Sequence, residues 1–202
     1  MTSVKISQIF FDQQSCSWDE NIGEDKVNRI ENIFNNKILT LKAPVLDLGS
    51  GTGILLPVFK KYGISNNSVF EMDISLKMLL CARAKYENQY DTHYIQADGH
   101  LLPLAPDCFG SAICFQVFPH FLDKYKAANE IFSTLNKNGV LVILHLMGHY
   151  ELNELHRQTG HAVEKDRILP AEKLAQLLVS AGFNIKHVEE STNLYLIIGQ
   201  KS

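Results

Sequence analysis

The sequence lacks the features of disulfide-rich, membrane-spanning and nucleic-acid-binding proteins. Its four cysteines form no CxxC pair and show no regular spacing, so neither a disulfide framework nor a cysteine metal site is predicted. The longest apolar run, Gly139 to Met147, is interrupted by His145 and is too short to cross a bilayer. The net charge is −3 and the sequence pI is near 6.2, which provides no basic surface for nucleic acid or for anionic lipid.

Sequence features that indicate secretion or a division into several domains are also missing. The N-terminal segment has no long apolar core followed by a small-residue cleavage site, so no signal peptide is predicted. No repeat, low-complexity segment or Gly/Ser/Pro-rich linker is present. With 46% hydrophobic and 20% charged residues, the chain of 202 residues can bury its own core. We therefore expect a single cytoplasmic domain over residues 1–202, with no nucleic-acid or membrane partner.

Short apolar segments alternate with helical segments along most of the chain. The predicted strands are residues 44–48, 68–73, 93–97, 111–117, 140–146, 183–189 and 193–199. Such alternation predicts a parallel sheet with right-handed crossovers and helices on both faces. Only a short polar turn separates the last two strands, so these two are antiparallel to each other. The predicted fold class is α/β, a doubly wound, mostly parallel seven-stranded sheet with an antiparallel last strand.

The spacing of apolar residues locates the helices between these strands. The expected helices run from Asp25 to Leu41, from Ser75 past Arg83, from Ala128 to Asn138-Gly139, and from Pro170 to Gly182. In the first of these, apolar residues recur at helical spacing through Ile38. The helix from Ser75 is expected to carry Leu76, Leu79, Leu80 and Arg83 along one side.

A glycine-rich loop, Gly49-Ser-Gly51-Thr-Gly53, follows the first predicted strand. Glycines there allow a tight turn and the close approach of a ligand. The loop differs from the dinucleotide-binding fingerprint, because that motif needs a glycine where this sequence has Ile54. Acids follow the next two strands: Asp73 is placed to accept hydrogen bonds from ribose hydroxyls, and Asp98 from an adenine amino group.

Three ordered segments carry a family resemblance: VLDLGSGTG (45–53), VFEMDIS (69–75) and IQADGHLLPLAPDCFGSAICFQVF (95–118). Together they resemble the class I S-adenosylmethionine-dependent methyltransferases, and among these the small-molecule branch that contains the ubiquinone/menaquinone methyltransferases. The resemblance implies a Rossmann-like fold, S-adenosylmethionine as methyl donor, S-adenosylhomocysteine as product, and transfer by in-line displacement. One departure is Phe109-Gly110, where the family often has Phe-Asp; we interpret it as a local packing change.

The resemblance also implies a cofactor site. That site comprises Asp47, Gly49, Ser50, Gly51, Thr52, Gly53, Asp73, Ile74, Met78, Ala97, Asp98, Gly99 and Gln116. The glycine loop would pass the methionyl part of the cofactor, with Asp47 near its amino group and Gln116 close to the same end. Asp73 would hold the ribose, and Asp98 with Gly99 would face the adenine. The apolar side chains of Ile74 and Met78 would pack on the adenine ring.

The sequence does not identify the methyl acceptor. Methyltransferases that act on nucleic-acid amines have an Asn/Asp-Pro-Pro-aromatic motif, whereas this chain has Phe115-Gln-Val-Phe118. No recognition domain is appended, so a small-molecule acceptor is favoured. Its identity is expected to depend on two covering segments, an N-terminal helical cap (1–43) and a lid-like insertion (145–169), which is too long for an ordinary connection. The oligomeric state is open, with a homodimer as one option.

Histidines gather near the same edge of the predicted sheet. His120 follows the fourth strand, His145 interrupts the end of the fifth, and His149, His156 and His161 lie in the lid-like segment. We consider His145, His156 and His120 as catalytic bases, because imidazole titrates near neutral pH. A metal site, or ordinary loop and surface histidines, are the alternatives. His145 is the first choice because it interrupts an otherwise apolar strand.

Other side chains are candidates for the walls of an acceptor pocket. The aromatic candidates are Phe10, Phe11, Trp18, Phe118, Phe121 and Tyr150, unless the first helix simply packs on the domain. Leu152, Leu155 and His156 are expected to share one face of a short helix. Arg157 and Asp166 are expected to pair with each other or to hold a polar acceptor.

Three functions of different classes therefore remain. The first is methyl transfer to a small molecule. The second is a nicotinamide-dependent oxidoreductase, which Ile54 disfavours. The third is a noncatalytic S-adenosylmethionine-binding module, against which the intact acidic residues argue.

Overall fold

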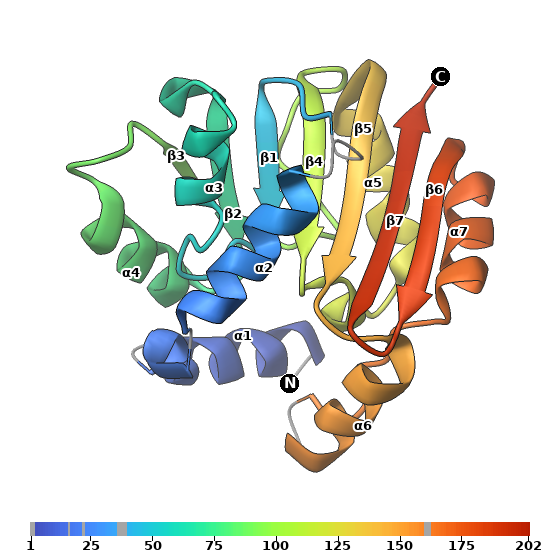
Figure 1. Ribbon diagram of the computed structural model, residues 1–202, viewed down its shortest axis with the longest axis horizontal. Coiled ribbons are helices and arrows are strands. Elements are labelled where there is room, and N and C mark those ends of the chain that lie inside the picture. The colour runs from blue at the N-terminus through green and yellow to red at the C-terminus, as the bar shows by residue number, and fades with distance from the viewer. Residues whose placement is uncertain (1–2, 16, 22, 36–39, 160–162) are drawn as a thin grey trace.

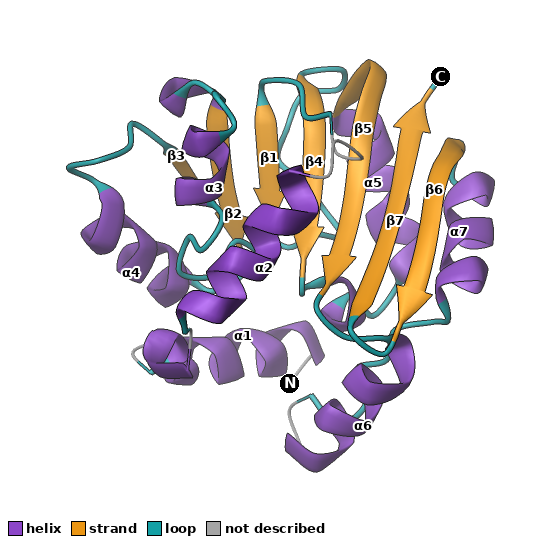
Figure 2. Ribbon diagram, viewed as in Figure 1, coloured by secondary structure: helices purple, strands orange, loops and turns teal. Residues whose placement is uncertain are grey.

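The computed structural model describes residues 3–15, 17–21, 23–35, 40–159 and 163–202. Helices and strands alternate through most of this chain (Figure 1, Figure 2). The strands are β1 (Val45–Leu48), β2 (Val69–Asp73), β3 (His93–Gln96), β4 (Phe109–Phe115), β5 (Leu135–His145), β6 (Phe183–Ser191) and β7 (Leu194–Lys201). The α-helices are α1 (Ser3–Gln14), α2 (Glu24–Asn35), α3 (Leu56–Lys61), α4 (Leu76–Tyr86), α5 (Lys124–Thr134), α6 (His149–Thr159) and α7 (Ala171–Ser180).

The strands form a seven-stranded sheet in the order β3-β2-β1-β4-β5-β7-β6. Neighbours from β3 to β5 are parallel, whereas β7 runs antiparallel to both β5 and β6. The predicted fold class is therefore confirmed. The direction of winding changes between β1 and β4, and ligands of such sheets bind at the carboxyl ends of the strands beside this point. In the described part of the chain, no helix is long and apolar enough to cross a membrane.

Apolar side chains cover both faces of the sheet. On one face, Phe34 of α2 and Phe59 of α3 are packed in one cluster with Val45 of β1. On the other face, Ile131 of α5 and Leu174 of α7 belong to a second cluster with the facing strand residues. Burial on both sides explains why the central strands are almost continuously apolar. Helices α1 and α6 lie instead along the carboxyl edge of the sheet (Figure 1), where they enclose the ligand end.

Two predicted helices end earlier than expected. Helix α2 ends at Asn35, Leu41 lies in the loop before β1, and Ile38 is outside the described residues. Helix α5 ends at Thr134, so the segment expected to finish this helix is the start of β5. The reason is strand pairing, because Leu135 is in register with Phe109 of β4. A helical spacing of apolar residues cannot reveal such a long-range pairing.

The buried side of helix α4 only partly overlaps the predicted row of four residues. Leu76, Leu80 and Arg83 are exposed, and only Leu79 of the four is buried. The buried side instead carries Met78, Leu79, Ala82 and Tyr86. Both sides of this helix are rich in apolar residues, so periodicity alone does not select the buried one.

The unusual Gly110 in β4 has a steric explanation. A Cβ atom at this position would lie 2.5 Å from the carbonyl oxygen of Lys42 and 2.7 Å from that of Ala43. The Gly110 amide also donates a hydrogen bond to the Pro44 carbonyl at 2.9 Å. The segment before β1 therefore passes too close for any side chain, which agrees with a local packing change.

The two sides of α4 can be compared by alanine substitution of adjacent leucines. Leu79 is 3% exposed and Leu80 is 53% exposed. We expect Leu79→Ala to lower the free energy of unfolding by about 2–5 kcal/mol, because it leaves a cavity in a packed interface. Leu80→Ala should change it by less than about 0.5 kcal/mol. Urea unfolding of both variants measures the difference, and equal losses would contradict the assigned face.

Candidate functional site

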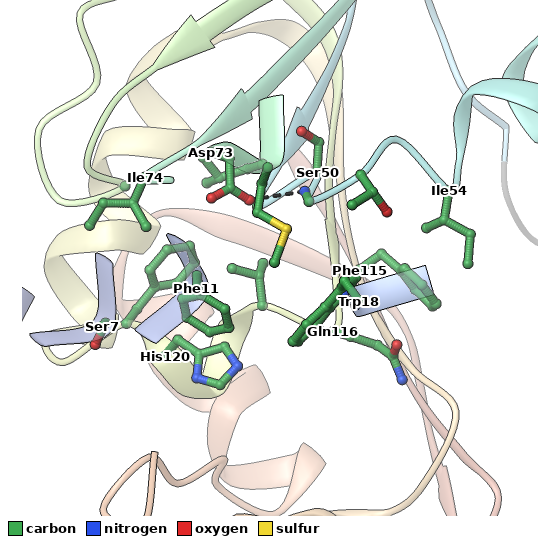
Figure 3. A pocket seen from close by; sticks show the side chains of 18 of the residues that line it. Ser7, Phe11, Trp18, Ser50, Ile54, Asp73, Ile74, Phe115, Gln116 and His120 are labelled. Carbon is green, nitrogen blue, oxygen red and sulfur yellow. Dashed lines mark hydrogen bonds between the residues drawn. The ribbon is translucent and has the colours of Figure 1, made fainter. Parts of the chain in front are cut away.

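A cavity of about 660 Å³ lies at the carboxyl edge of the sheet. Its walls come from the loops after β1, β2, β3 and β4 and from α1, α2 and α6. Most of the predicted cofactor residues line it: Gly49, Ser50, Gly51, Thr52, Asp73, Ile74, Met78, Ala97, Asp98, Gly99 and Gln116. Figure 3 shows Asp73 and Ile74 on one side of this cavity, with Phe11 and His120 below them. The structure thus brings together residues from four separate strand ends.

The glycine loop requires its glycines for two different reasons. Gly49, Gly51 and Gly53 have φ angles of 73°, 57° and 79°, a region that L-residues with side chains rarely adopt. At Gly49 a Cβ would also lie 2.2 Å from Cγ2 of Val117. At Gly51 the nearest atom would be Nε1 of Trp18 at 3.8 Å, so the space beside this residue is open. Gly49 therefore serves packing, whereas Gly51 leaves room in the cavity.

The carboxylate of Asp73 joins the glycine loop to α4. Its Oδ2 accepts a hydrogen bond from the Gly51 amide at 2.9 Å (dashed line in Figure 3), and its Oδ1 accepts one from the Ser75 amide at 2.8 Å. Burial raises the pKa of Asp73, and these two backbone hydrogen bonds oppose that rise. The hydroxyl of Ser75 caps α4 by accepting from the Met78 amide and donates to Asp12 of α1. One carboxylate thus fixes three elements around the cavity.

The loop after β3 presents Asp98 and Gly99 to the same cavity. Oδ1 of Asp98 accepts hydrogen bonds from the His100 amide at 2.9 Å and from its Nδ1 at 2.6 Å. Because Nε2 of His100 accepts from the Asp123 amide, the ring is the tautomer with its proton on Nδ1. A Cβ on Gly99 would lie 2.5 Å from the ring of Phe121, so this aromatic side chain closes the wall.

Gln116, the predicted contact at the methionyl end, has a strained backbone. Its φ angle is 56°, which is uncommon for a residue other than glycine. The Gln116 amide donates to the Leu144 carbonyl at 2.9 Å, so β5 holds the turn in this conformation. The side chain consequently lies at the cavity wall next to Trp18 and Phe115 (Figure 3).

Two of the predicted cofactor residues, Asp47 and Gly53, do not line the cavity. Gly53 packs against Leu56 and Tyr86. Asp47 is 1% exposed, and neither of its carboxyl oxygens has a hydrogen-bond partner in the described part of the chain. Burial raises its pKa to about 8, and the charge of Asp73 adds to the rise. Because Asp47 is buried beneath the glycine loop, it can act on a ligand in the cavity only through its charge and not by direct contact.

A second buried acid, Glu71, lies beside Asp47. The two residues are in register on the neighbouring strands β1 and β2, so their side chains project from the same face of the sheet. Burial raises the pKa of Glu71 well above its ordinary value, and the Asp47 carboxylate raises it further. Glu71 was not among the predicted site residues, although its place as an acid within the apolar segment Val69–Asp73 could have identified it.

Of the candidate histidines, His120 and His156 line the cavity and His145 does not. Nδ1 of His120 lies 2.6 Å from Oδ2 of Asp166, and Nδ1 of His156 lies 3.1 Å from the backbone oxygen of the same residue. The His120 and His156 rings are 5.1 Å apart between centroids. These two imidazoles, from the loop after β4 and from α6, therefore lie side by side at the cavity wall.

His145, the first choice from the sequence, lies in the core. Its side chain is fully buried with the ring against Tyr195 of β7, and neither ring nitrogen has a partner among the described residues. Burial lowers its pKa to about 3, and His120 and His156 add to this effect. The ring stays neutral and out of reach of the cavity, because strand alternation directs it toward the helical layer. The structure therefore does not support the choice of His145 as a base.

The lid-like segment differs from expectation in its ion pairs. Arg157 and Asp166 do not pair with each other: Arg157 binds Glu154 through two hydrogen bonds, and Asp166 binds His120. His149 pairs with Glu190, and His161 is outside the described residues.

Leu152, Leu155 and His156 all line the cavity from α6, as expected. In the described part of the chain, no three His, Cys, Asp or Glu residues are grouped so that they could hold a metal ion.

Only some of the predicted aromatic residues reach the cavity. Phe11, Trp18 and Phe121 line it, and Phe11 packs edge-on against His120 with centroids 5.0 Å apart. Phe118 is fully buried in the core, and Tyr150 is largely exposed. Phe10 packs against Phe11 and is not part of the cavity wall.

Lys26 is a further cavity residue that the sequence analysis missed. It lies on α2, within the predicted N-terminal cap, and burial lowers its pKa although Asp19 opposes this shift. No local pattern distinguishes it from the surface lysines of the chain. Its position depends on how α2 crosses the sheet, which is a long-range property.

Part of the chain is similar to known methyltransferases. Residues 46–143 match the family model described as a methyltransferase domain. The chain is similar to the ubiquinone/menaquinone biosynthesis C-methyltransferase UbiE of Wigglesworthia glossinidia brevipalpis, with 35% identity over 50% of this chain and 41% of that protein. It is also similar to a malonyl-[acyl-carrier protein] O-methyltransferase of Marinomonas sp. strain MWYL1, with 30% identity over 65% of this chain and 48% of that protein. Each match spans less than half of the relative.

Solved structures share the fold at lower identity. The magnesium protoporphyrin IX methyltransferase of Synechocystis PCC 6803, solved with bound S-adenosylhomocysteine, has a TM-score of 0.75, 17% identity and full coverage of both chains. An S-adenosylmethionine-dependent methyltransferase of Thermotoga maritima has a TM-score of 0.74, with 17% identity over 97% of this chain and 100% of that one. The [4+2]-cyclase SpnF has a TM-score of 0.68, with 18% identity over 86% of this chain and 80% of that one. These likenesses confirm the fold.

The buried acids Asp47 and Glu71 predict that stability depends on pH. Because the folded state raises their pKa values, it holds protons that the unfolded chain releases above about pH 4. Stability is therefore highest at low pH in this window and falls as the pH rises toward about 8, by about 1.4 kcal/mol per pH unit for each proton retained. Glu71→Gln should make this fall shallower in urea unfolding measured between these limits.

The exposed Glu87→Gln provides a matched surface control for this measurement. Its slope of unfolding free energy against pH should equal that of the unchanged chain. An unchanged slope in Glu71→Gln would show that Glu71 does not retain a proton in the folded state.

Proposed function

We propose that this chain is a class I S-adenosylmethionine-dependent methyltransferase that transfers a methyl group to a small-molecule acceptor. The matched methyltransferase domain and the order of the strands in the sheet support this proposal. The observation that carries the proposal is the hydrogen bond between the Gly51 amide and the Asp73 carboxylate inside the cavity. This bond joins the glycine loop and the acid of the second motif into one continuous binding surface.

The donor half of the cavity fits S-adenosylmethionine. Asp73 would accept hydrogen bonds from the ribose hydroxyls, and Asp98 from the adenine amino group. Ile74 and Met78 supply apolar surface for the adenine, and the open space at Gly51 admits the methionyl part. When bound, this donor supplies an electrophilic methyl group on a sulfonium. The contribution of the chain is to align the acceptor and to exclude water.

The acceptor half is formed by the two covering segments. From residues 1–43, Phe11 and Trp18 extend into the cavity, and from 145–169, Leu155 and His156 do so. The apolar and aromatic side chains of these walls suit a small acceptor with an apolar skeleton, and α2 adds the charged residues Asp25, Lys26 and Arg29. We therefore interpret the whole chain as one domain in which these segments determine the acceptor.

The competing functions receive less support. Ile54 lines the cavity where a nicotinamide-dinucleotide site needs a glycine, so its side chain occupies the space that a pyrophosphate would need. A noncatalytic binding module would need no second, histidine-containing half of the cavity. The likeness to a cyclase shows that this fold supports other chemistry, so methyl transfer itself has to be measured.

Calorimetric titration with S-adenosylhomocysteine and with NADH distinguishes the first two functions. We expect saturable binding of S-adenosylhomocysteine and none of NADH, because Ile54 stands where the dinucleotide-binding motif needs a glycine. Incubation with S-adenosylmethionine labelled in its methyl group then tests transfer to small acceptors. Binding of NADH alone would contradict the proposal, and binding of the donor with no transfer to any acceptor would favour a binding module.

The glycine loop offers a matched pair of variants. Gly51 and Gly63 have φ angles of 57° and 74°, and Gly63 has no neighbouring atom within 4 Å of an added Cβ. Gly51→Val and Gly63→Val should both cost about 1–2 kcal/mol of stability through backbone strain. Only Gly51→Val should abolish binding of S-adenosylhomocysteine, because it fills the open space in the cavity. Equal affinities in the two variants would exclude the glycine loop from the donor site.

A further inference from the structure

We propose that His120 and Asp166 act together as the base of this enzyme, and that the acceptor is an aromatic compound methylated at a hydroxyl oxygen. His120 is the catalytic residue and Asp166 is its positioning residue. The inference rests on the proposed methyl transfer and deepens it by assigning the chemical class of the acceptor.

The contact between the two side chains fixes the tautomer of the imidazole. Nδ1 of His120 lies 2.6 Å from Oδ2 of Asp166, and the Asp166 side chain is 6% exposed. An ionised carboxylate only accepts hydrogen bonds, so the proton is on Nδ1 and the lone pair is on Nε2. His120 lines the cavity, with its ring beside Phe11 (Figure 3). The arrangement is that of a base with a buried carboxylate that stabilises its protonated form.

Both partners are held rigidly. Nζ of Lys124 donates to the carbonyl oxygens of Pro119 and Phe121, the residues on either side of His120. The backbone oxygen of Asp166 accepts from Nδ1 of His156 and from Nη1 of Arg167, each at 3.1 Å. The pair is therefore preorganised and does not depend on a flexible side chain finding its partner.

The other two imidazoles are poor bases by comparison. His145 is buried away from the cavity, and burial lowers its pKa to about 3. Burial also lowers the pKa of His156, with a contribution from His120, and its Nδ1 contacts a backbone carbonyl where His120 has a carboxylate. The charged and titratable groups around His120 are Asp166, Asp73, His145, His156 and Lys124. Among them, only Asp166 contacts the ring directly through a carboxylate.

The position of His120 relates it to both halves of the cavity. Burial raises the pKa of Asp73 in the donor half, and the nearby His120 is one of the smaller effects that oppose this rise. On the cavity side, Phe11 packs edge-on against the ring, and Leu152 and Leu155 line the same cavity from α6. An acceptor beside His120 is thus surrounded by groups that favour a flat apolar skeleton with one polar atom directed at Nε2.

A hydroxyl on an aromatic ring matches this environment and needs a base. As its O–H proton moves to Nε2 of His120, the oxygen attacks the methyl carbon of the donor and an O–C bond forms. The C–S bond breaks, and its electron pair stays on sulfur, which becomes the neutral thioether of S-adenosylhomocysteine. The imidazolium, held by Asp166, then releases its proton to water.

Two phenols test the assignment at about pH 8, where 4-nitrophenol is largely ionised and phenol is not. We compare their turnover by the unchanged chain, by His120→Gln and by Asp166→Asn. With phenol, kcat should fall about 10²- to 10³-fold in each variant, because the proton has no acceptor. With 4-nitrophenol it should fall less than about threefold, since this acceptor arrives without its proton. KM values and the affinity for S-adenosylhomocysteine should stay within about twofold.

His149→Gln is the matched control, because His149 forms a similar pair with Glu190 outside the cavity. It should leave turnover of both phenols unchanged. Equal losses for the two phenols in Asp166→Asn would indicate a structural role and overturn the proposal, as would full activity of both variants. Methylation of neither phenol by a chain that binds S-adenosylhomocysteine would overturn the hydroxyl class alone. Failure to bind S-adenosylhomocysteine would instead contradict the proposed function. If one variant does not fold, the other carries the same comparison.

Discussion

The arrangement of the cavity depends on one buried carboxylate, that of Asp73. It receives the amides of Gly51 and Ser75, so it fixes both the glycine loop and the start of α4. Through Ser75 the same constraint extends to Asp12 on α1, the helix that closes the cavity. Burial disfavours an ionised carboxylate, and the two amide donors offset part of that cost for Asp73, so they favour this conformation of the loop.

The two halves of the cavity differ in their electrostatics. Beneath the donor half lie three acids on adjacent strands, Asp47, Glu71 and Asp73, and burial raises the pKa of each. The acceptor half has imidazoles in place of carboxylates. A positively charged ligand would lower the cost of ionising the acids, whereas a neutral acceptor suits the other side. The uneven charge thus gives the cavity a donor end and an acceptor end before any ligand binds.

The sequence was sufficient for those features that depend on local patterns. The strands, the glycine loop and the acids that follow β2 and β3 are local, and so they were predicted. The buried side of α4 and the start of β5 depend on which surfaces meet. The spacing of Leu76 and Leu80 therefore does not identify the buried side of α4, and the local sequence at Leu135 does not reveal that β5 starts there. His145 was preferred because it interrupts a strand, but the face on which it projects follows only from the assembled sheet.

The contact between His120 and Asp166 joins residues 46 positions apart, which no local pattern could reveal. Asp166 lies in the chain after α6, and the Asn153 side chain holds that chain through two hydrogen bonds with the backbone of Ile168. The segment that supplies the apolar wall therefore also positions the carboxylate. A substitution that reshapes α6 to admit another acceptor would move Asp166 as well, so acceptor choice and base strength are coupled in this fold. Such coupling limits how far the acceptor can change while the same base is kept.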